Sequence, residues 1–207
     1  MEETTKNTEI KDVQLKPQAE ESLSKKVGLF FVDFLQTFII AAAVFILVYH
    51  FLCQPNQVLG ASMDPNFENG QYILTDKISY RLHEPKRGDV IVFKYPNQPT
   101  LDYIKRIIAL PGEEVLLHEG RVFIFNSENP TGIELNEGYL PSTVYTDGGI
   151  KFPSNIKTVV PLNSYFVMGD NREKSSDSRA WGAVPKEDII GRAVFRYWPP
   201  SKFGFVK

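Results

Sequence analysis

The chain has 207 residues, a formal net charge of −2 and a single cysteine. Because charges of the two signs nearly balance, no basic field favours DNA or RNA as a partner, and the lone Cys53 excludes an internal disulfide. The three histidines are scattered without an i,i+4 pair, so metal-ligand spacing is absent and we expect neither a metal nor a cofactor.

The N-terminal part divides into a polar tail and an apolar run. Residues 1–26 mix Glu, Asp and Lys with few large apolar side chains, so we predict a disordered tail that cannot bury enough surface to fold. The run over residues 34–53 carries no charge and has about the 20 residues needed to cross a bilayer. The sequence therefore predicts a transmembrane anchor over residues 27–53, with the lipid bilayer as a partner.

The distribution of basic residues predicts the orientation of this anchor. Lys25 and Lys26 precede the run, and the next basic residue is Lys77, which places the N-terminus in the cytoplasm and the rest of the chain outside a cell membrane crossed once. A cleaved secretory signal is the alternative, but it has a shorter apolar stretch and ends at a small-x-small site. Residues 54–57 offer no pair of small residues, which favours a retained anchor.

Residues 54–207 have the usual size of one domain with its own core. Glu119-Gly120 lies at hairpin spacing between two β-rich runs, and residues 126–163 indicate an excursion of loops and short strands. The predicted fold class is mainly β, a single N-terminal transmembrane helix followed by an antiparallel β-rich domain without internal repeats. The predicted strands are residues 71–75, 89–95, 102–110, 114–117, 121–125, 165–168 and 192–198.

Ser62 and Lys105 are candidates for a nucleophile and its base. A serine hydroxyl needs a base to become a nucleophile, and a lone Gly-x-Ser more often marks a turn. Lys105 lies in an apolar strand-like run, where burial and the neighbouring Arg106 would both disfavour its ammonium form and make it a usable base. The alternative is that Lys105 and Arg106 are two basic residues on a solvated strand edge.

Residues 169–179 are rich in hydrogen-bonding groups and poor in apolar ones, which predicts a loop. The alternation of Ser175, Asp177 and Arg179 would place a hydroxyl and an ion pair on one side of an extended loop, where Ser175 could orient Lys105. A plain solvent-exposed turn is the alternative.

Taken together, these segments resemble the bacterial type I signal peptidases, the leader peptidase family of Ser/Lys dyad serine peptidases. The motifs that carry the resemblance, besides the anchor, are Ser62-Met63-Asp64-Pro65, Arg87-Gly88-Asp89-Val90, Lys105-Arg106 with Pro111-Gly112-Glu113, and Gly169-Asp170-Asn171-Arg172 through Asp177-Ser178-Arg179. They occur in the family's order across residues 30–198, and the last motif is far more specific than Gly-x-Ser or Lys-Arg alone.

The resemblance implies a serine endopeptidase that removes signal peptides from secreted preproteins at Ala-x-Ala sites through an acyl-enzyme. Ser62 would be the nucleophile, Lys105 the general base and Ser175 a hydrogen-bond partner of Lys105. The Ser62 N–H would stabilise the oxyanion, and Gly60 offers no side-chain donor where some relatives carry a hydroxyl. Support of the catalytic loop is implied for Asp170, Asp177, Arg179 and Arg106.

The resemblance also implies shallow apolar pockets for the substrate. Core packing explains each of their residues equally well. Phe67 stands where the family usually has leucine, so we expect a narrowed first pocket that favours glycine or alanine before the cut. Trp198, Phe203 and Phe205 suit a membrane interface, or else a capping strand. The implied pocket residues are Val58, Leu59, Met63, Phe67, Tyr103 and Ile104.

Two other functions compete with this interpretation. A catalytically silent homologue would act as a membrane-bound scaffold or substrate-binding module, and loss of Ser62 or Lys105 would indicate it, but both are present. A self-cleaving Ser/Lys regulator would need a DNA-binding helix pair, and the N-terminus offers a polar tail and an apolar run in its place. For the peptidase we expect activity to be lost on acidification, as Lys105 becomes protonated.

Overall fold

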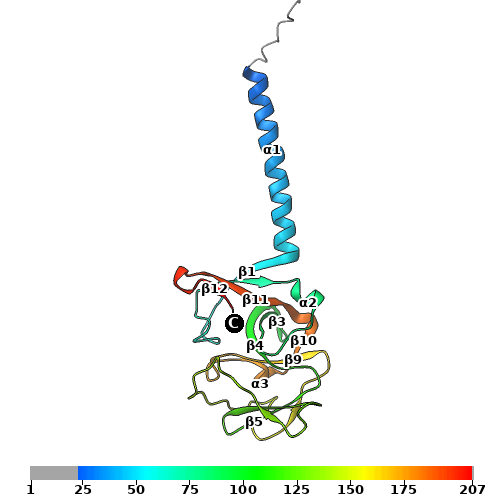
Figure 1. The fold of residues 1–207 in the computed structure, drawn as a ribbon, viewed down its shortest axis with the longest axis vertical. Helices are drawn as coiled ribbons and strands as arrows, with labels where there is room; N and C mark the ends of the chain where they lie inside the picture. The colour runs from blue at the N-terminus through cyan, green and yellow to red at the C-terminus, as the bar shows by residue number, and fades with distance from the viewer. Residues whose placement is uncertain (1–22, 207) are drawn as a thin grey trace, which may run out of the picture. The chain divides into compact units, whose positions relative to one another are not determined.

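The computed structural model of the protein describes residues 23–206, which fall into two compact units, residues 23–45 and 46–206. Helix α1 (Leu23–Leu47) is the blue helix of Figure 1, and a short π-helical segment, Val48–Leu52, follows it. Within the described residues, Lys25–Leu47 is the one stretch of helix long and apolar enough to cross a membrane, with a mean hydropathy of 2.3.

The observed bounds correct two predicted boundaries. The predicted tail over residues 1–26 falls mostly outside the described residues, and its last four residues already belong to α1. At the other end, Cys53, which we assigned to the anchor, is the first residue of strand β1 (Cys53–Gln57). Its backbone is extended, with φ −150° and ψ 152°, because β1 pairs with β2 and Pro55 cannot continue a helix.

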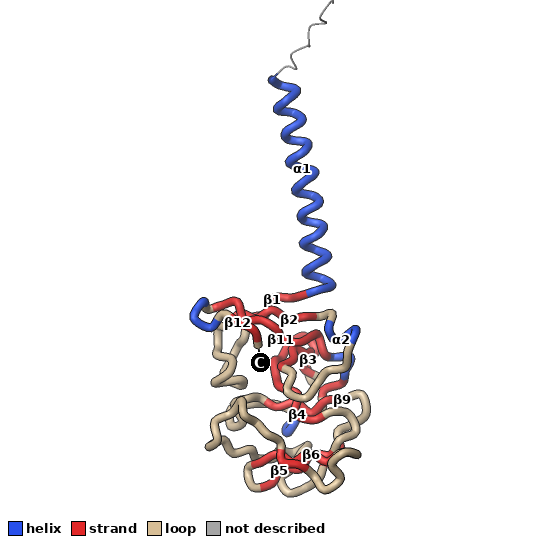
Figure 2. Tube along the Cα trace, in the orientation of Figure 1, coloured by secondary structure: helices blue, strands red, loops and turns tan. Residues whose placement is uncertain are grey.

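The second unit is mainly antiparallel β, as predicted, and its larger sheet positions the residues of interest. The strand order is β1-β2-β11-β3-β4-β9-β10, and β12 pairs with β11. Figure 2 shows that helices are short and few in this unit. The strands of this sheet besides β1 are β2 (Tyr72–Asp76), β3 (Val90–Tyr95), β4 (Gln98–Ala109), β9 (Ser164–Met168), β10 (Val184–Pro185), β11 (Ile189–Trp198) and β12 (Gly204–Phe205).

A smaller sheet with the strand order β7-β6-β5-β8 forms the end of this unit that lies away from β1 and β2 (Figure 1). Strands β5 (Glu114–His118) and β6 (Arg121–Phe125) are the predicted hairpin, and its turn residues Glu119 and Gly120 both have positive φ, 48° and 78°. That is the geometry of the primed turns that suit the twist of a hairpin. The short strands β7 (Ile133–Glu134) and β8 (Thr158–Val159) lie in the predicted excursion.

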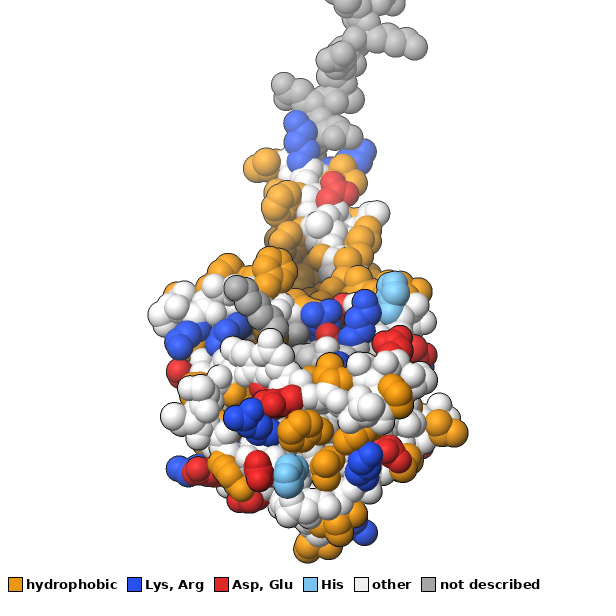
Figure 3. All heavy atoms as spheres, turned by 60° about the horizontal axis from the view of Figure 1, so that its bottom comes forward, with side chains coloured by type: hydrophobic (Ala, Val, Ile, Leu, Met, Phe, Trp, Pro, Cys, Tyr) orange, Lys and Arg blue, Asp and Glu red, His pale blue; other side chains and the backbone are white. Residues whose placement is uncertain are grey.

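Three clusters of buried side chains form the core. One fills the space between the small sheet and β9, another packs around Phe93 and Tyr165, and a third packs around Ile73 and Val92 beneath the segment that carries Ser62. On the face shown in Figure 3, the surface of this unit mixes charged side chains of both signs with scattered apolar ones. The remaining short helices of the unit are α2 (Ser79–Leu82), α3 (Ser178–Trp181) and the 3-10 turns Lys186–Asp188 and Pro200–Lys202.

Candidate active site

Ser62 lies in a turn that leaves the sheet after β1 and returns to it before β2. The neck of this turn is closed by two backbone hydrogen bonds, from Val58 N to Gln71 O and from Gly70 N to Val58 O, both 2.8 Å. Met63 is fully buried and anchors the turn in the core. This arrangement brings the half-buried Ser62 toward strand β4, where Lys105 Nζ donates a 2.8 Å hydrogen bond to Ser62 Oγ.

Lys105 is buried in the middle of the sheet rather than on a solvated edge. It pairs with Ile91 of β3, and only 3% of its surface is exposed. Burial lowers the pKa of its amine from 10.5 to about 8, against the opposing effect of the Asp177 and Asp170 carboxylates. A sizeable fraction of Lys105 is therefore neutral near physiological pH, as a general base requires.

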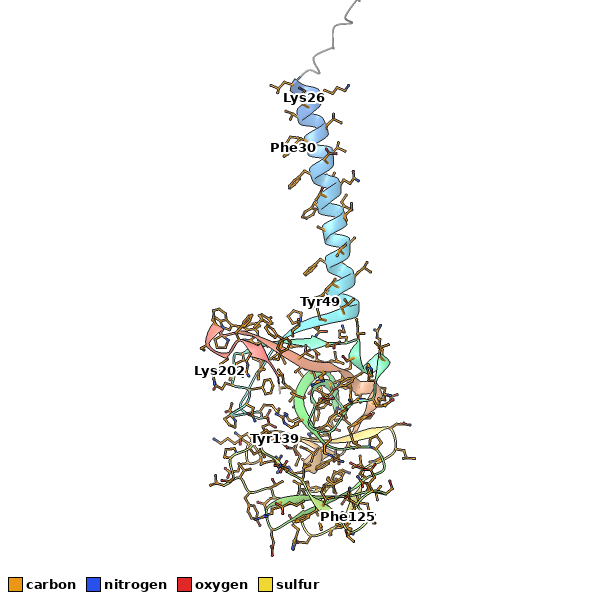
Figure 4. The ribbon with its side chains drawn as sticks, in the orientation of Figure 1. Lys26, Phe30, Tyr49, Phe125, Tyr139 and Lys202 are labelled. Carbon is orange, nitrogen blue, oxygen red and sulfur yellow. The ribbon has the colours of Figure 1, made fainter. Side chains whose placement is uncertain are left out.

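Arg106 does not contribute to this shift in the way we expected from the sequence. Neighbouring side chains of a strand point to opposite faces, and Arg106 turns away from Lys105 to donate two hydrogen bonds to Asp170, of 2.9 and 2.8 Å. It also donates to Gly88 O at 2.9 Å, and its guanidinium lies 4.1 Å above the ring of Tyr139, which Figure 4 labels. Arg106 is not among the causes of the shift, and desolvation is the effect that lowers the pKa of Lys105.

Asp170 connects three segments of the chain. Besides Arg106, it accepts a 2.9 Å hydrogen bond from Asn66 Nδ2, which also donates to Tyr139 O at 2.9 Å. Asn66 belongs to the turn that carries Ser62, Arg106 follows Lys105 on β4, and Tyr139 belongs to the excursion over residues 126–163. The predicted support residue Asp170 thus fixes the segment of Ser62 against the strand of Lys105, and Asn66 is a contact that the sequence did not suggest.

Asp177 and Arg179 form the predicted ion pair at the start of α3. Arg179 Nε and Nη2 donate to the two Asp177 oxygens at 2.8 and 2.9 Å, and both residues are buried. Asp177 also accepts from Gly169 N at 3.1 Å and from Arg179 N at 3.2 Å, so it caps the helix as well. Arg179 Nη2 further donates to Arg172 O at 2.7 Å. This pair therefore closes the loop over residues 169–179 on itself.

Ser175 lies close to the site, but its predicted hydrogen bond to Lys105 is absent. Its buried Oγ has no hydrogen-bond partner among the described residues, whereas Lys105 Nζ donates to Ser62 Oγ and to Ile104 O, each at 2.8 Å. The Ile104 carbonyl takes the place that we expected Ser175 to fill. Ser175 is instead packed against Gly169, where a Cβ would lie 2.3 Å from its Oγ.

A cavity of about 440 Å³ opens beside Ser62 and Lys105. The segment after β1 forms one wall with Val58 and Leu59, and β4 forms the other with Tyr103 and Ile104, four of the six predicted pocket residues. From the loop over residues 169–179, Lys174 and Ser176 also line it. The cavity combines apolar walls with the Ser62 hydroxyl and the Lys105 amine, which share a hydrogen bond. It therefore suits an extended apolar segment presented to Ser62.

Met63 and Phe67, the other two predicted pocket residues, do not line this cavity. They are 0% and 2% exposed and pack in the core with Ile73, Val90 and Ala193. The Arg196 guanidinium lies over the Phe67 ring, 5.4 Å from its centroid. The expected narrowing of the pocket by Phe67 is therefore wrong for this cavity, and core packing, the alternative interpretation, accounts for both residues.

Arg172 stands at the centre of a network to which the sequence assigned no role. Its side chain is fully buried and forms an ion pair with Glu137, whose side chain is 15% exposed. It also donates to Thr146 Oγ1 at 2.7 Å and, through Nε, to Gly169 O at 3.1 Å. Arg172 thus attaches the loop over residues 169–179 to the excursion over residues 126–163. The position of Arg172 inside the specific motif over residues 169–172 could have indicated a role for it. Its partner Glu137 lies outside every motif, so no pattern in the sequence indicated the ion pair.

Within residues 23–206, no group of three or more His, Cys, Asp or Glu side chains has the geometry to hold a metal ion. The site thus consists of a serine hydroxyl, a buried amine and a shell of ion pairs around them.

A serine peptidase is the class of protein that this fold and this site fit. Comparison with known proteins leads to one family: residues 31–198 match the family described as signal peptidase, peptidase S26. Similar curated proteins include signal peptidase I from Leptolyngbya laminosa, 40% identical over 74% of this chain and 73% of the relative, and signal peptidase I from Aquifex aeolicus, 35% identical over 77% and 80%. The chain therefore belongs to the signal peptidase S26 family.

Other similar proteins include one more curated relative and one solved structure. A probable signal peptidase I-2 from Synechocystis is 34% identical over 83% of this chain and 75% of its own length. The crystal structure of a signal peptidase I from Enterococcus faecalis aligns with a TM-score of 0.43 at 29% identity, over 53% of this chain and 97% of the other.

Proposed function

We propose that this chain, a membrane-anchored serine endopeptidase that removes signal peptides from secreted preproteins, uses Ser62 as its nucleophile and Lys105 as its general base. The observation that carries the proposal is the 2.8 Å hydrogen bond from Lys105 Nζ to Ser62 Oγ at the side of an open apolar cavity. A lysine whose pKa is lowered to about 8 can accept the serine proton without a histidine.

The acylation step follows from this geometry. Ser62 Oγ attacks the carbonyl carbon of the residue before the cut while Lys105 Nζ takes the hydroxyl proton. The tetrahedral oxyanion forms beside the Ser62 backbone, whose N–H donates a hydrogen bond to it. Lys105 then gives its proton to the leaving amine, the C–N bond breaks, and the signal segment remains as an ester on Ser62.

Deacylation uses the same two residues in reverse. Lys105, neutral again, takes a proton from a water molecule that attacks the ester carbonyl, and the proton returns to Ser62 Oγ as the C–O bond breaks. The buried ion pairs of Arg106 with Asp170 and of Arg179 with Asp177 hold the strand and the loop on either side of this chemistry. They act as support for the reacting groups and do not touch the substrate.

The walls of the cavity suggest how the cleavage site is selected. Val58 and Ile104 come from two segments that face each other across the space beside Ser62, so a peptide between them runs extended with alternate side chains toward the walls. Small side chains before the cut fit such shallow apolar walls better than large ones, which agrees with an Ala-x-Ala site.

The same proposal places the N-terminus in the cytoplasm and residues 54–207 outside the membrane. Lys25 and Lys26 at the start of α1 support this orientation. Exposed aromatic residues of the β11 and β12 region, with Trp198 at 53%, Phe203 at 66% and Phe205 at 80% exposure, suit contact with the headgroup layer. Phe205 is also part of a strand that pairs with β11, so it can fill both roles considered from the sequence.

The test is an incubation of the purified full chain in detergent with a preprotein that carries an Ala-x-Ala site, beside Ser62→Ala and Lys105→Ala. Mass spectrometry of the products locates any cut. We expect one cut after the last alanine in the wild type and none in either variant. Binding without cleavage by the wild type would support a scaffold instead. Cleavage that persists in Lys105→Ala would remove lysine from the role of base.

A further inference from the structure

Asn171 holds both peptide groups that flank Ser62. Its backbone N–H donates to Ser62 O at 3.1 Å, and its side-chain Nδ2 donates to Ala61 O at 3.0 Å. The other end of the same amide, Oδ1, accepts from Lys174 N at 3.2 Å. Because the nitrogen end has an acceptor and the oxygen end has a donor, the hydrogen bonds fix the orientation of the amide.

The bond to Ala61 O determines where the Ser62 N–H points. Ala61 O and Ser62 N belong to one planar peptide group, and in this trans peptide the carbonyl and the N–H point in opposite directions. Among the described residues, the Ser62 N–H donates to no protein group, so it is available to an incoming oxygen. Fixing the carbonyl of Ala61 therefore fixes the direction of this donor.

Few other contacts hold this peptide group. Gly60, just before it, has a positive φ of 87°, and a Cβ there would meet no atom within 4 Å, so the local packing does not restrict it. The second donor to Ala61 O is Asp64 N, at a long 3.3 Å. Asn69 accepts from Gly60 N at 2.8 Å, but Gly60 N belongs to the Leu59–Gly60 peptide, two peptide groups before the Ala61–Ser62 peptide. Without the Asn171 side chain, the long contact from Asp64 N would be the one remaining hydrogen bond on Ala61 O among the described residues.

We propose that Asn171 is a positioning residue that aims the Ser62 N–H at the oxyanion of the tetrahedral intermediate. The inference rests on the proposed role of Ser62 as the nucleophile. Asn171 itself touches neither Ser62 Oγ nor Lys105, so its removal leaves the pair of nucleophile and base in place. Its effect falls on the stabilisation of the transition state and not on the binding of the substrate or the ionisation of Lys105.

The test compares Asn171→Ala and Asn171→Asp with the wild type on the same preprotein. Asp has the shape of Asn but lacks the donor, and its charge repels Ala61 O. We expect kcat to fall by roughly 10-fold in Asn171→Ala and at least as far in Asn171→Asp, with KM within about twofold, less than the 100-fold or more lost with a whole oxyanion donor. The acid limb of the pH profile should not move in Asn171→Ala, because Lys105 keeps its charged surroundings; this comparison leaves out Asn171→Asp, whose added carboxylate can itself act on Lys105.

A peptide aldehyde that ends in Ala-x-Ala gives a second readout. Its hemiacetal with a serine forms an oxyanion-like oxygen, whereas the matching peptide amide does not. Inhibition by the aldehyde should weaken by the same factor as kcat/KM in both variants, and inhibition by the amide should stay unchanged. Equal weakening of both inhibitors, or a displaced acid limb in Asn171→Ala, would reduce Asn171 to a general structural role and overturn the proposal.

The control is Glu173→Ala, an exposed position on the same loop for which the described residues show no hydrogen bond to residues 61 and 62. It should leave kcat and both inhibition constants unchanged, and a fall equal to that of Asn171→Ala would mean that any change in this loop suffices. The outcomes also separate the two proposals. If Ser62→Ala is inactive while both Asn171 variants match the wild type, the positioning role fails and the proposed function stands. If the wild type itself does not cleave, the proposed function fails.

Discussion

Gly169 and Ser175 are packed so closely that a Cβ on residue 169 would lie 2.3 Å from the Ser175 Oγ. The same Cβ would lie 2.3 Å from Ser62 O, a backbone atom that cannot move without moving the proposed nucleophile. Glycine is therefore required here by space and not by backbone conformation.

This packing predicts that Gly169→Ala displaces Ser62 from Lys105. We expect a loss of activity on the order of 100-fold, because small displacements of reacting groups have large effects on rate. The measurement is kcat with a cleavable preprotein. Gly138→Ala is the control, because its Cβ would meet Asn136 at an ordinary 3.6 Å, and it should keep full activity.

The lowered pKa of Lys105 predicts a pH dependence with a definite sign. Burial lowers this pKa to about 8, so below that pH the amine is mostly protonated and cannot accept the serine proton. Log kcat/KM should rise with slope one, about tenfold per pH unit, below pH 8 and level off above it. Rates measured with a neutral peptide substrate test this. A flat profile between about pH 6 and about pH 9 would contradict the role of Lys105 as the base.

Asp177 offers a way to move that profile. Its carboxylate raises the pKa of Lys105, against the larger effect of burial, and Asp170 does so to a lesser degree. In Asp177→Asn, the acid limb should therefore shift to lower pH, even though the weakened loop lowers the maximal rate. Asp170→Asn should give a smaller shift in the same direction. A shift to higher pH in either variant would show that the carboxylates do not act on Lys105 through their charge.

Two Arg–Glu pairs of different exposure predict different contributions to stability. Arg172 is fully buried against Glu137, whereas Arg121 and Glu134 on the small sheet are 63% and 48% exposed. Removal of one partner of a buried pair leaves an uncompensated charge, so Arg172→Leu should lower the free energy of unfolding by about 3–5 kcal/mol. For Arg121→Leu we expect a change of less than about 1 kcal/mol. Urea unfolding of both variants makes the comparison, and equal effects would refute it.

Substitutions at Phe67 and Ile104 test whether a residue packs in the core or selects the substrate. Phe67→Leu should leave the preference for alanine over valine before the cut unchanged, because Phe67 lies in the core and not in the cavity. It should lower stability by less than about 1.5 kcal/mol. Ile104→Ala shortens a side chain that lines the cavity and so enlarges the cavity. It should raise the rate for valine before the cut relative to that for alanine. The ratio of kcat/KM for two preproteins that differ only at this residue decides the matter.

The sequence predicted the features that depend on local pattern. The strand over residues 121–125 is observed with these bounds, and the Glu119-Gly120 turn appears where its spacing indicated. Strand β1 was missed, because Gln54, Pro55 and Asn56 show no alternation of apolar and polar residues, and only the pairing with β2 makes the segment a strand.

At the site, the order of the motifs along the chain predicted which residues lie near one another. It did not predict the direction of each side chain. Ser62 and Lys105 do share a hydrogen bond. The direction of Arg106, the packing of Ser175 and the burial of Met63 depend on which side of a strand or turn each side chain leaves, and on contacts with segments that no motif contains. Glu137 and Asn66 are such contacts, and each reaches a motif residue across the fold.

Strand β1 also limits how far from the membrane the enzyme can work. Ser62 follows Cys53 by nine residues, and a chain of that length spans at most about 30 Å even when fully extended. These nine residues thus form a short tether that begins where the apolar run ends and carries the Ser62 hydroxyl. A segment with alanines at the right spacing would escape cleavage if it lay farther out than this tether can reach. We therefore predict that distance from the bilayer acts as a second criterion of selection, independent of the fit of side chains in the cavity.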